Sequence, residues 1–247
     1  MKLNVEQLVQ EMTLEEKAGL CSGENFWFTK AVERLGIPGI MVTDGPHGLR
    51  KQAKQADHLG LNASVEAVCF PAGCALASSF DRALLQSVGE KLGEEAWSEH
   101  VHTLLGPAIN IKRSPLCGRN FEYLSEDPYL AGELAASYIN GVQSQDVGVS
   151  VKHFACNNQE RRRMSVSARI SQRALHEIYL AAFETAVKKA HPWTMMCSYN
   201  RINGVYSCEN KWLLDDVLRK EWGFDGIVMT DWGAMNDRCK PLEAGLE

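Results

Sequence analysis

The sequence lacks the features that mark membrane, secreted and nucleic-acid-binding proteins. No apolar run approaches the roughly 20 residues that a membrane-spanning helix needs. The first six residues contain no apolar core of a signal peptide, so we expect a cytoplasmic protein. The formal net charge of -5 leaves no basic surface of the kind that binds nucleic acid. Neither a membrane nor a nucleic acid is therefore an expected partner.

The cysteines lack the spacing of metal or redox sites. The chain has 8 Cys, and no two of them form a Cys-x-x-Cys pair. Several lie in apolar runs, which indicates buried free thiols in a reducing compartment. His100 and His102 have a spacing that can bind zinc, but they lie at the start of a predicted strand, away from the end where barrel enzymes place their sites. We therefore predict no metal site and no cofactor.

What the chain does contain is an alternation of strand and helix patterns. Residues 51–68 have no clear period and are predicted as a loop. Short apolar runs suggest seven strands, near residues 40, 76, 104, 150, 196, 206 and 228. Apolar residues at helical spacing predict helices at 5–20, 81–99, 129–143, 171–190 and 211–220. Asp81 is the expected N-cap of the second helix, and a capping box at Thr13 could divide the first into two short helices.

This alternation predicts an α/β fold with a parallel sheet. At 247 residues it favours a (β/α)8 TIM-type barrel over a doubly wound sheet. An eight-stranded barrel needs one more strand than the seven candidates, and none follows the last of them. We therefore predict that residues 1–247 form one catalytic barrel, truncated before its last strand.

The stretch 225–233 has the pattern of a buried strand that ends in a carboxylate. Residues 227–230 are an apolar run of the kind found in parallel sheets covered on both faces. Asp231 follows where the strand meets solvent, and Trp232 offers a flat surface for a sugar ring. We interpret Asp231 as a nucleophile.

Polar and aromatic residues follow the other predicted strands as well. Barrel enzymes place their active sites at these strand ends. Carboxylates accept hydrogen bonds from sugar hydroxyls, and basic side chains donate to them. The set therefore predicts a carbohydrate pocket, against the plainer interpretation that these are ordinary surface residues. Its members are Asp44, Arg113 in the loop after the strand near 104, Lys152, His153, Tyr199, Asp231 and Trp232.

Six motifs in order along the chain resemble the N-terminal barrel domain of glycoside hydrolase family 3, in its β-glucosidase branch. They are residues 42–50 (VTDGPHGLR), 105–122 (LGPAINIKRSPLCGRNFE), 125–128 (SEDP), 152–154 (KHF), 196–200 (MCSYN) and 229–232 (MTDW). The resemblance implies a hydrolase that acts at the non-reducing end of a small β-glucoside or oligosaccharide and retains the anomeric configuration through a covalent glycosyl-enzyme.

The resemblance also assigns residues. Asp231 corresponds to the catalytic nucleophile, and Trp232 lines the pocket. The residues that match the glycone-binding set are Asp44, Arg113, Lys152, His153, Arg163 and Tyr199.

Two departures from the family pattern matter. Thr230 stands where Ser usually precedes the nucleophile, which keeps the hydroxyl. In this branch the general acid/base is a Glu of a second α/β domain, which these residues do not contain. Glu122 and Glu126 are the nearest substitutes in the sequence, and we expect low activity of this chain alone.

Three other functions stay open. A single-domain β-N-acetylglucosaminidase of the same family has a His-Phe-Pro-Gly run, whereas Phe154 is followed here by Ala155 and Cys156. A Schiff-base lyase could use Lys152. A truncated, poorly active barrel that lacks its acid/base could only bind sugar.

Overall fold

The structure is a computed structural model that describes residues 4–53 and 62–247. Part of the predicted loop 51–68 therefore lies outside the described residues. The elements follow in chain order: α1 (Val5–Glu11), α2 (Leu14–Leu20), η1 (Glu33–Leu35), β1 (Val42–Thr43), α3 (Gly73–Ala77), α4 (Arg82–Ser98), β2 (Thr103–Leu104), α5 (Pro128–Gln143), β3 (Gly148–Phe154), β4 (Ser167–Ala168), α6 (Gln172–Ala174), η2 (Leu175–Tyr179), α7 (Ala181–Ala190), β5 (Thr194–Cys197), β6 (Arg201–Ile202), β7 (Val205–Tyr206), η3 (Ser207–Glu209), η4 (Trp212–Glu221), β8 (Ile227–Thr230) and α8 (Cys239–Ala244).

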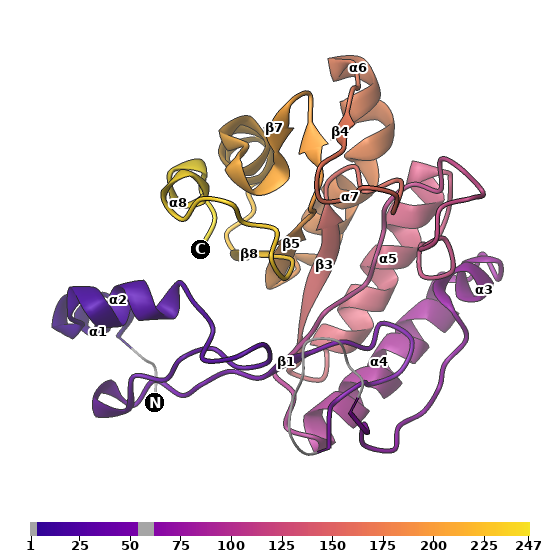
Figure 1. Cartoon of the computed structure of the whole chain (residues 1–247). Helices are drawn as coiled ribbons and strands as arrows, with labels where there is room; N and C mark the ends of the chain where they lie inside the picture. The colour runs from indigo at the N-terminus through magenta and orange to yellow at the C-terminus, as the bar shows by residue number, and fades with distance from the viewer. Residues whose placement is uncertain (1–3, 54–61) are drawn as a thin grey trace.

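The centre of the fold is a curled, five-stranded parallel sheet (Figure 1). Its order β1-β2-β3-β5-β8 is also the chain order, and each neighbouring pair is parallel. The predicted α/β class with a parallel sheet is therefore confirmed. The described strands form half of a barrel rather than a closed eight-stranded one. Parallel pairing brings all five carboxyl ends to one edge of the sheet.

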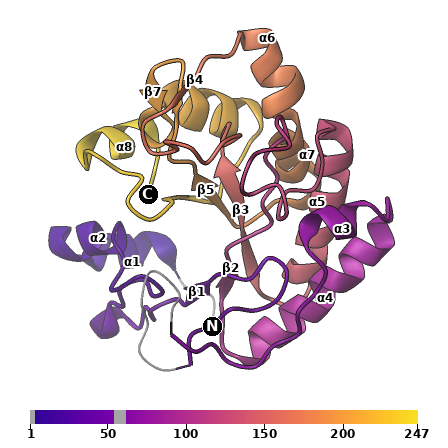
Figure 2. The same cartoon turned by 45° about the vertical axis from the view of Figure 1, so that its right-hand side comes forward.

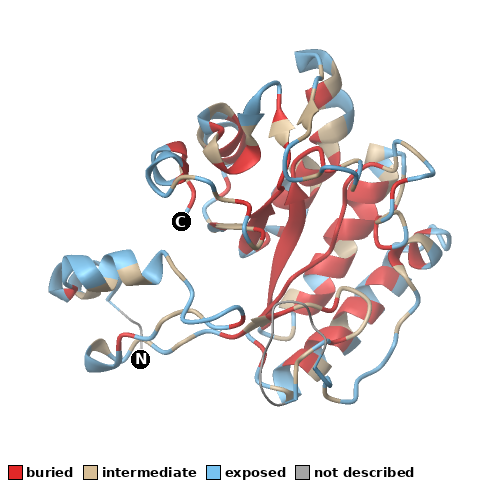
Figure 3. Cartoon of the chain, viewed as in Figure 1, coloured by how far each residue is buried: buried red, intermediate tan, exposed pale blue. Residues whose placement is uncertain are grey.

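Helices α4, α5 and α7 cover one face of this sheet (Figures 1 and 2). Their apolar stripes supply side chains that are fully buried, among them Leu92 of α4, Ile139 of α5 and Phe183 of α7. Figure 3 shows the buried residues gathered in β3, β5 and the sheet-facing sides of the helices. The helix layer thus fixes the sheet and, with it, the edge where the strands end.

The predicted helix starts at Thr13 and Asp81 are confirmed. Thr13 caps α2 through a reciprocal capping box with Glu16, so the predicted 5–20 segment consists of two short helices. The Asp81 side chain accepts the backbone N–H groups of Ala83 and Leu84 at the start of α4. Both caps satisfy N–H groups that a helix cannot pair internally.

Two of the predicted strands do not belong to the sheet. The run near 76 is helix α3, because a short apolar run of Ala and Leu suits either state and neighbouring packing decides. The run near 206 is β7, which pairs with β6 in an antiparallel hairpin of a separate three-stranded sheet. Asn203 and Gly204 connect these two strands with φ of +50° and +98°, the pattern of a tight hairpin turn.

Strand β8 is not covered on both faces as its sequence predicted. Ile227 is 54% exposed. Among the described residues, β8 pairs only with β5 and is an edge strand. The side chain of Ile227 faces solvent, and that of Val228, on the opposite face, is buried.

The cysteines are all free thiols, but they are not all buried. Cys117, Cys156, Cys197 and Cys208 are buried as expected. The prediction was wrong for the exposed Cys21, Cys69 and Cys239. Among residues 4–53 and 62–247, every helix is too short or too polar to cross a membrane.

Candidate active site

A pocket of about 460 Å³ opens at the carboxyl ends of the parallel strands. The parallel sheet therefore brings seven of the eight predicted site residues together, and Arg113 is the exception. The lining side chains are Asp44, Arg119, Lys152, His153, Arg163, Met164, Met196, Tyr199, Asp231 and Trp232.

Asp231 leaves the end of β8 at the pocket and is 6% exposed. Its Oδ1 accepts two hydrogen bonds, from the Tyr199 hydroxyl at 2.9 Å and from the Trp232 backbone N–H at 2.8 Å. No group of the described residues donates to Oδ2, which lies 3.7 Å from Nε2 of His153. One carboxylate oxygen is thus held in place while the other is left for a ligand.

The strand that carries Asp231 packs tightly against its neighbour. A Cβ on Gly226, just before β8, would lie 2.3 Å from the Trp193 carbonyl oxygen, so only glycine fits. The close approach lets β8 pair with β5 from Thr194 to Cys197. Asp231 and Tyr199 therefore leave adjacent strands side by side.

Burial sets the acidity of Asp231. Loss of solvent raises the pKa of this carboxyl, and the Tyr199 hydrogen bond with the positive charges of Lys152 and Arg119 acts in the opposite direction. Burial and these three groups together therefore decide over which pH range Asp231 carries the negative charge of a nucleophile.

Lys152 and Asp44, which both line the pocket, form an ion pair. Nζ of Lys152 lies 3.3 Å from Oδ1 of Asp44. Lys152 projects from β3 with a side chain that is 6% exposed, whereas the side chain of Asp44 is 30% exposed. After Asp44 the chain turns at Gly45, whose φ of +132° favours glycine. The pair offers a sugar hydroxyl both an acceptor and a donor.

His153 is held without charge. It is 1% exposed, and burial lowers its pKa well below the usual value, an effect that Arg119, Lys152 and Arg163 reinforce. A neutral imidazole carries one proton, so one ring nitrogen donates and the other accepts.

The arginine that lines the pocket is not the one that the sequence predicted. Arg113 is exposed and does not line the pocket, whereas Arg119 does. Glu122, itself buried, pairs with Arg119 through Nε and holds it toward the pocket. Arg119 stands in the 105–122 motif, but the segment between Leu104 and Pro128 has no helix or strand that would reveal which arginine turns inward.

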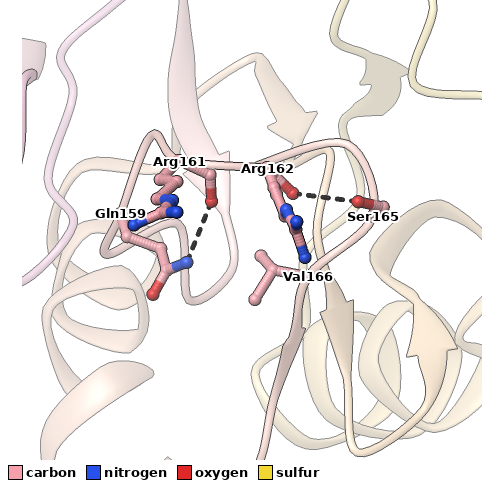
Figure 4. Close-up of a pocket in the computed structure, with 5 residues that line it drawn as sticks. All are labelled: Gln159, Arg161, Arg162, Ser165 and Val166. Carbon is pink, nitrogen blue, oxygen red and sulfur yellow. Dashed lines mark hydrogen bonds between the residues drawn. The ribbon is translucent and has the colours of Figure 1, made fainter.

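Arg163 is the arginine of its loop that reaches the pocket. Its guanidinium lies 4.6 Å from the centre of the Tyr199 ring and donates to Glu160 Oε2 at 2.8 Å. Figure 4 shows that Arg161 and Arg162 line a separate hollow with Gln159, Ser165 and Val166. Gln159 and Ser165 bind the backbone carbonyls of those two arginines and so fix the loop.

Trp232 is supported from the N-terminal segment. Its ring centre lies 4.8 Å from that of Trp27 at an interplanar angle of 78°. Its indole N–H donates to the carbonyl of Phe26 at 3.3 Å. The sequence patterns did not indicate this contact between residues that are about 200 positions apart. It holds the aromatic surface beside Asp231.

The two glutamates considered as substitute acids do not line the pocket. Glu122 is engaged with Arg119, and Glu126 is exposed. Asp44 is the only other carboxylate among the described lining residues, and it pairs with Lys152. In the described part of the chain, no three or more His, Cys, Asp and Glu side chains come together in a way that could hold a metal ion. His100 and His102 are therefore not part of such a group.

The sequence matches a protein-family model and named proteins of other organisms. The model of the "Glycosyl hydrolase family 3 N terminal domain" matches residues 23–244. "Thermostable beta-glucosidase B" of Acetivibrio thermocellus is 61% identical over 247 residues, 100% of this chain and 33% of the relative. "Exo-alpha-(1->6)-L-arabinopyranosidase" of Bifidobacterium breve is 60% identical over 239 residues, 96% of this chain and 32% of the relative. The chain thus spans about a third of the length of these relatives.

A solved structure shares the fold. Beta-glucosidase 3B from Thermotoga neapolitana in complex with alpha-D-glucose superposes with a TM-score of 0.93 at 46% identity. The superposition covers 98% of this chain and 36% of that one.

Proposed function

The chain belongs to glycosyl hydrolase family 3, and from this membership we propose that the protein hydrolyses O-glycosidic bonds at the non-reducing end of β-glucosides. Asp231 attacks the anomeric carbon and forms a covalent glycosyl-enzyme, which water then hydrolyses with net retention. The names of relatives such as the A. thermocellus enzyme support the β-glucoside.

One observation carries the assignment of Asp231. Its Oδ1 is held by two donors, while no group of the residues that the structure describes donates to Oδ2. A nucleophile needs this division, because the held oxygen orients the carboxylate and the other oxygen keeps its lone pairs for the new bond. Asp44 is less firmly held, since Lys152 is the single donor recorded to its Oδ1 among the described residues and its side chain is 30% exposed.

The other lining residues supply the binding of the sugar. Asp44 and Lys152 offer an acceptor and a donor for neighbouring hydroxyls, and Arg119 and Arg163 offer further donors. Trp232 provides an apolar surface for a ring face. Polar groups of both kinds around one aromatic face fit a carbohydrate better than a hydrocarbon.

The acid/base is proposed to come from outside residues 1–247. A retaining glycosidase needs a second carboxyl group about 5–5.5 Å from the nucleophile, and no unpaired carboxylate among the described lining residues offers one. We assign this role to a Glu of a second α/β domain, as the family resemblance implies. A cytoplasmic location is part of the same proposal, with the free thiols as its support.

The test is azide rescue in the full-length protein. With 2,4-dinitrophenyl β-glucoside, whose leaving group needs no proton, Asp231→Ala should lose activity and regain turnover with azide, which yields the α-glucosyl azide. Asp44→Ala is the matched control, because it also removes a pocket carboxylate, and azide should not rescue it. Rescue of Asp44→Ala instead, or rescue of neither folded variant, would contradict the proposal.

The same assay examines the other sugars. Aryl α-L-arabinopyranoside is included because a relative of 60% identity is named for that activity. Aryl N-acetyl-β-glucosaminide represents the single-domain alternative. Preference for either over the β-glucoside would overturn the substrate part of the proposal and leave the role of Asp231 intact.

A further inference from the structure

The side chain of Asn110 is bonded to the backbone of His153 on both sides. Its Nδ2 donates to the His153 carbonyl at 2.8 Å, and its Oδ1 accepts the His153 backbone N–H at 2.8 Å. A carbonyl can only accept and a backbone N–H can only donate, so these two bonds fix which way the amide points. Asn110 is 2% exposed, so water does not compete for either hydrogen bond.

The fixed amide also faces the imidazole. Oδ1 of Asn110 lies 3.3 Å from Nδ1 of His153. An amide oxygen has only lone pairs, so a favourable contact requires that Nδ1 carry a proton. Because the ring is neutral, this proton is its only one, and Nε2 is then left with a free lone pair.

We propose that Asn110 is a positioning residue that locks His153 in the Nδ1–H tautomer, so that Nε2 enters the pocket as a hydrogen-bond acceptor. The positive groups around the ring favour its neutral form, and the contact with Asn110 then selects the tautomer. Asp231 lies on the Nε2 side, Arg119, Lys152 and Arg163 contribute positive charge, and Tyr123 meets the ring edge-on at 6.4 Å.

The tautomer explains why Oδ2 of Asp231 has no donor within residues 4–53 and 62–247. An Nε2–H would donate to this oxygen and compete with its attack on the sugar. A bare Nε2 cannot, and the 3.7 Å separation is beyond a hydrogen bond. If the proposed function holds, Nε2 accepts a hydrogen bond from a sugar hydroxyl while Oδ2 keeps its lone pairs for the anomeric carbon.

The tautomer can be read directly and without substrate. The probe is the ¹⁵N NMR spectrum of the full-length protein with labelled histidine, in which the His153 signals are those lost in His153→Gln. We expect a protonated Nδ1 and a bare Nε2 at neutral pH. A protonated Nε2 with a bare Nδ1, or a doubly protonated ring, would overturn the proposal whatever the protein hydrolyses.

A matched pair of variants tests the role of Asn110. Asn110→Ala removes the acceptor, and the proton should move to Nε2. The ring, released from Asn110, can then approach Oδ2 of Asp231 and donate a hydrogen bond to it. Asn203 makes the same two backbone bonds, to the N–H and carbonyl of Ile170, at 2.9 Å each, but no histidine is recorded against it. Asn203→Gly is the control, because the φ of +50° at this turn suits glycine.

The kinetic readout follows the spectrum. A hydrogen bond to the attacking carboxylate should lower kcat about ten- to a hundredfold in Asn110→Ala. In Asn203→Gly both kcat and the His153 spectrum should stay unchanged. An unchanged tautomer in Asn110→Ala would contradict the proposal. If that variant does not fold, the spectrum of the unmodified protein still decides.

Discussion

Tyr199→Phe tests how Asp231 is kept ionised. The Tyr199 hydroxyl lies 2.9 Å from Oδ1 of Asp231, and this bond lowers the carboxyl pKa against the effect of burial. Its removal should raise the pKa further. The ionised nucleophile is present above its pKa and is lost as the pH falls through it. The acid limb of the pH profile should therefore move to higher pH.

The size of the effect follows from the bond. A hydrogen bond to a charged group contributes about 1.5–3 kcal/mol, or about ten- to a hundredfold in the ratio of ionised to protonated carboxyl. The hydroxyl proton is shared with the Trp232 carbonyl, 2.8 Å away, so we take the lower end. At a pH below the pKa of Asp231, the substitution should lower kcat/KM about tenfold more than it does at the alkaline plateau.

The assay is kcat/KM against pH with 2,4-dinitrophenyl β-glucoside, whose leaving group avoids the titration of a general acid. Tyr206→Phe is the control, since Tyr206 also stacks on an arginine, at 4.3 Å, and makes no recorded contact with Asp231. An acid limb that stays in place, or that moves to lower pH, would refute the reasoning.

Three further changes probe the site and its frame. Asp231→Asn removes a buried charge, and the raised pKa of this carboxyl shows that the charge destabilises the fold. The variant should therefore have a higher melting temperature than the unmodified protein at pH 7, and the difference between the two should vanish toward pH ~4. A difference that grows on acidification would contradict this. Trp27→Ala removes the edge contact with Trp232 and should raise KM about two- to tenfold with little change in kcat. An unaltered KM would show that the Trp232 ring does not need this contact to bind the sugar. Asp81→Ala removes the N-cap of α4 and should lower the free energy of unfolding in urea by about 1 kcal/mol, and no loss would mean that the cap is dispensable.

The helices could be predicted because their signals are local. Periodic apolar residues and the caps at Thr13 and Asp81 depend only on neighbours along the chain. The strand near 76 was wrong because a short apolar run does not distinguish helix from strand. The strand near 206 belongs to a hairpin instead of the parallel sheet, because the turn at Asn203 and Gly204 pairs it with its neighbour along the chain.

The site could be predicted where strand ends define it and not where loops do. Asp231 and Lys152 follow from the rule that parallel strands end at one edge. Arg119 was missed because the loop around it has no period that fixes side-chain direction. Trp27 and Asn110 act through contacts across the fold, which one sequence does not reveal.

The central claim is that Asp231 forms the glycosyl-enzyme. The most direct measurement is labelling of the full-length protein with a 2,4-dinitrophenyl 2-deoxy-2-fluoro-β-glucoside. The fluorine slows both formation and hydrolysis of the glycosyl-enzyme, and the good leaving group speeds its formation, so the glycosyl-enzyme accumulates. Mass spectrometry of the peptides should find one sugar on Asp231. A sugar on Asp44 or on any other residue would contradict the account.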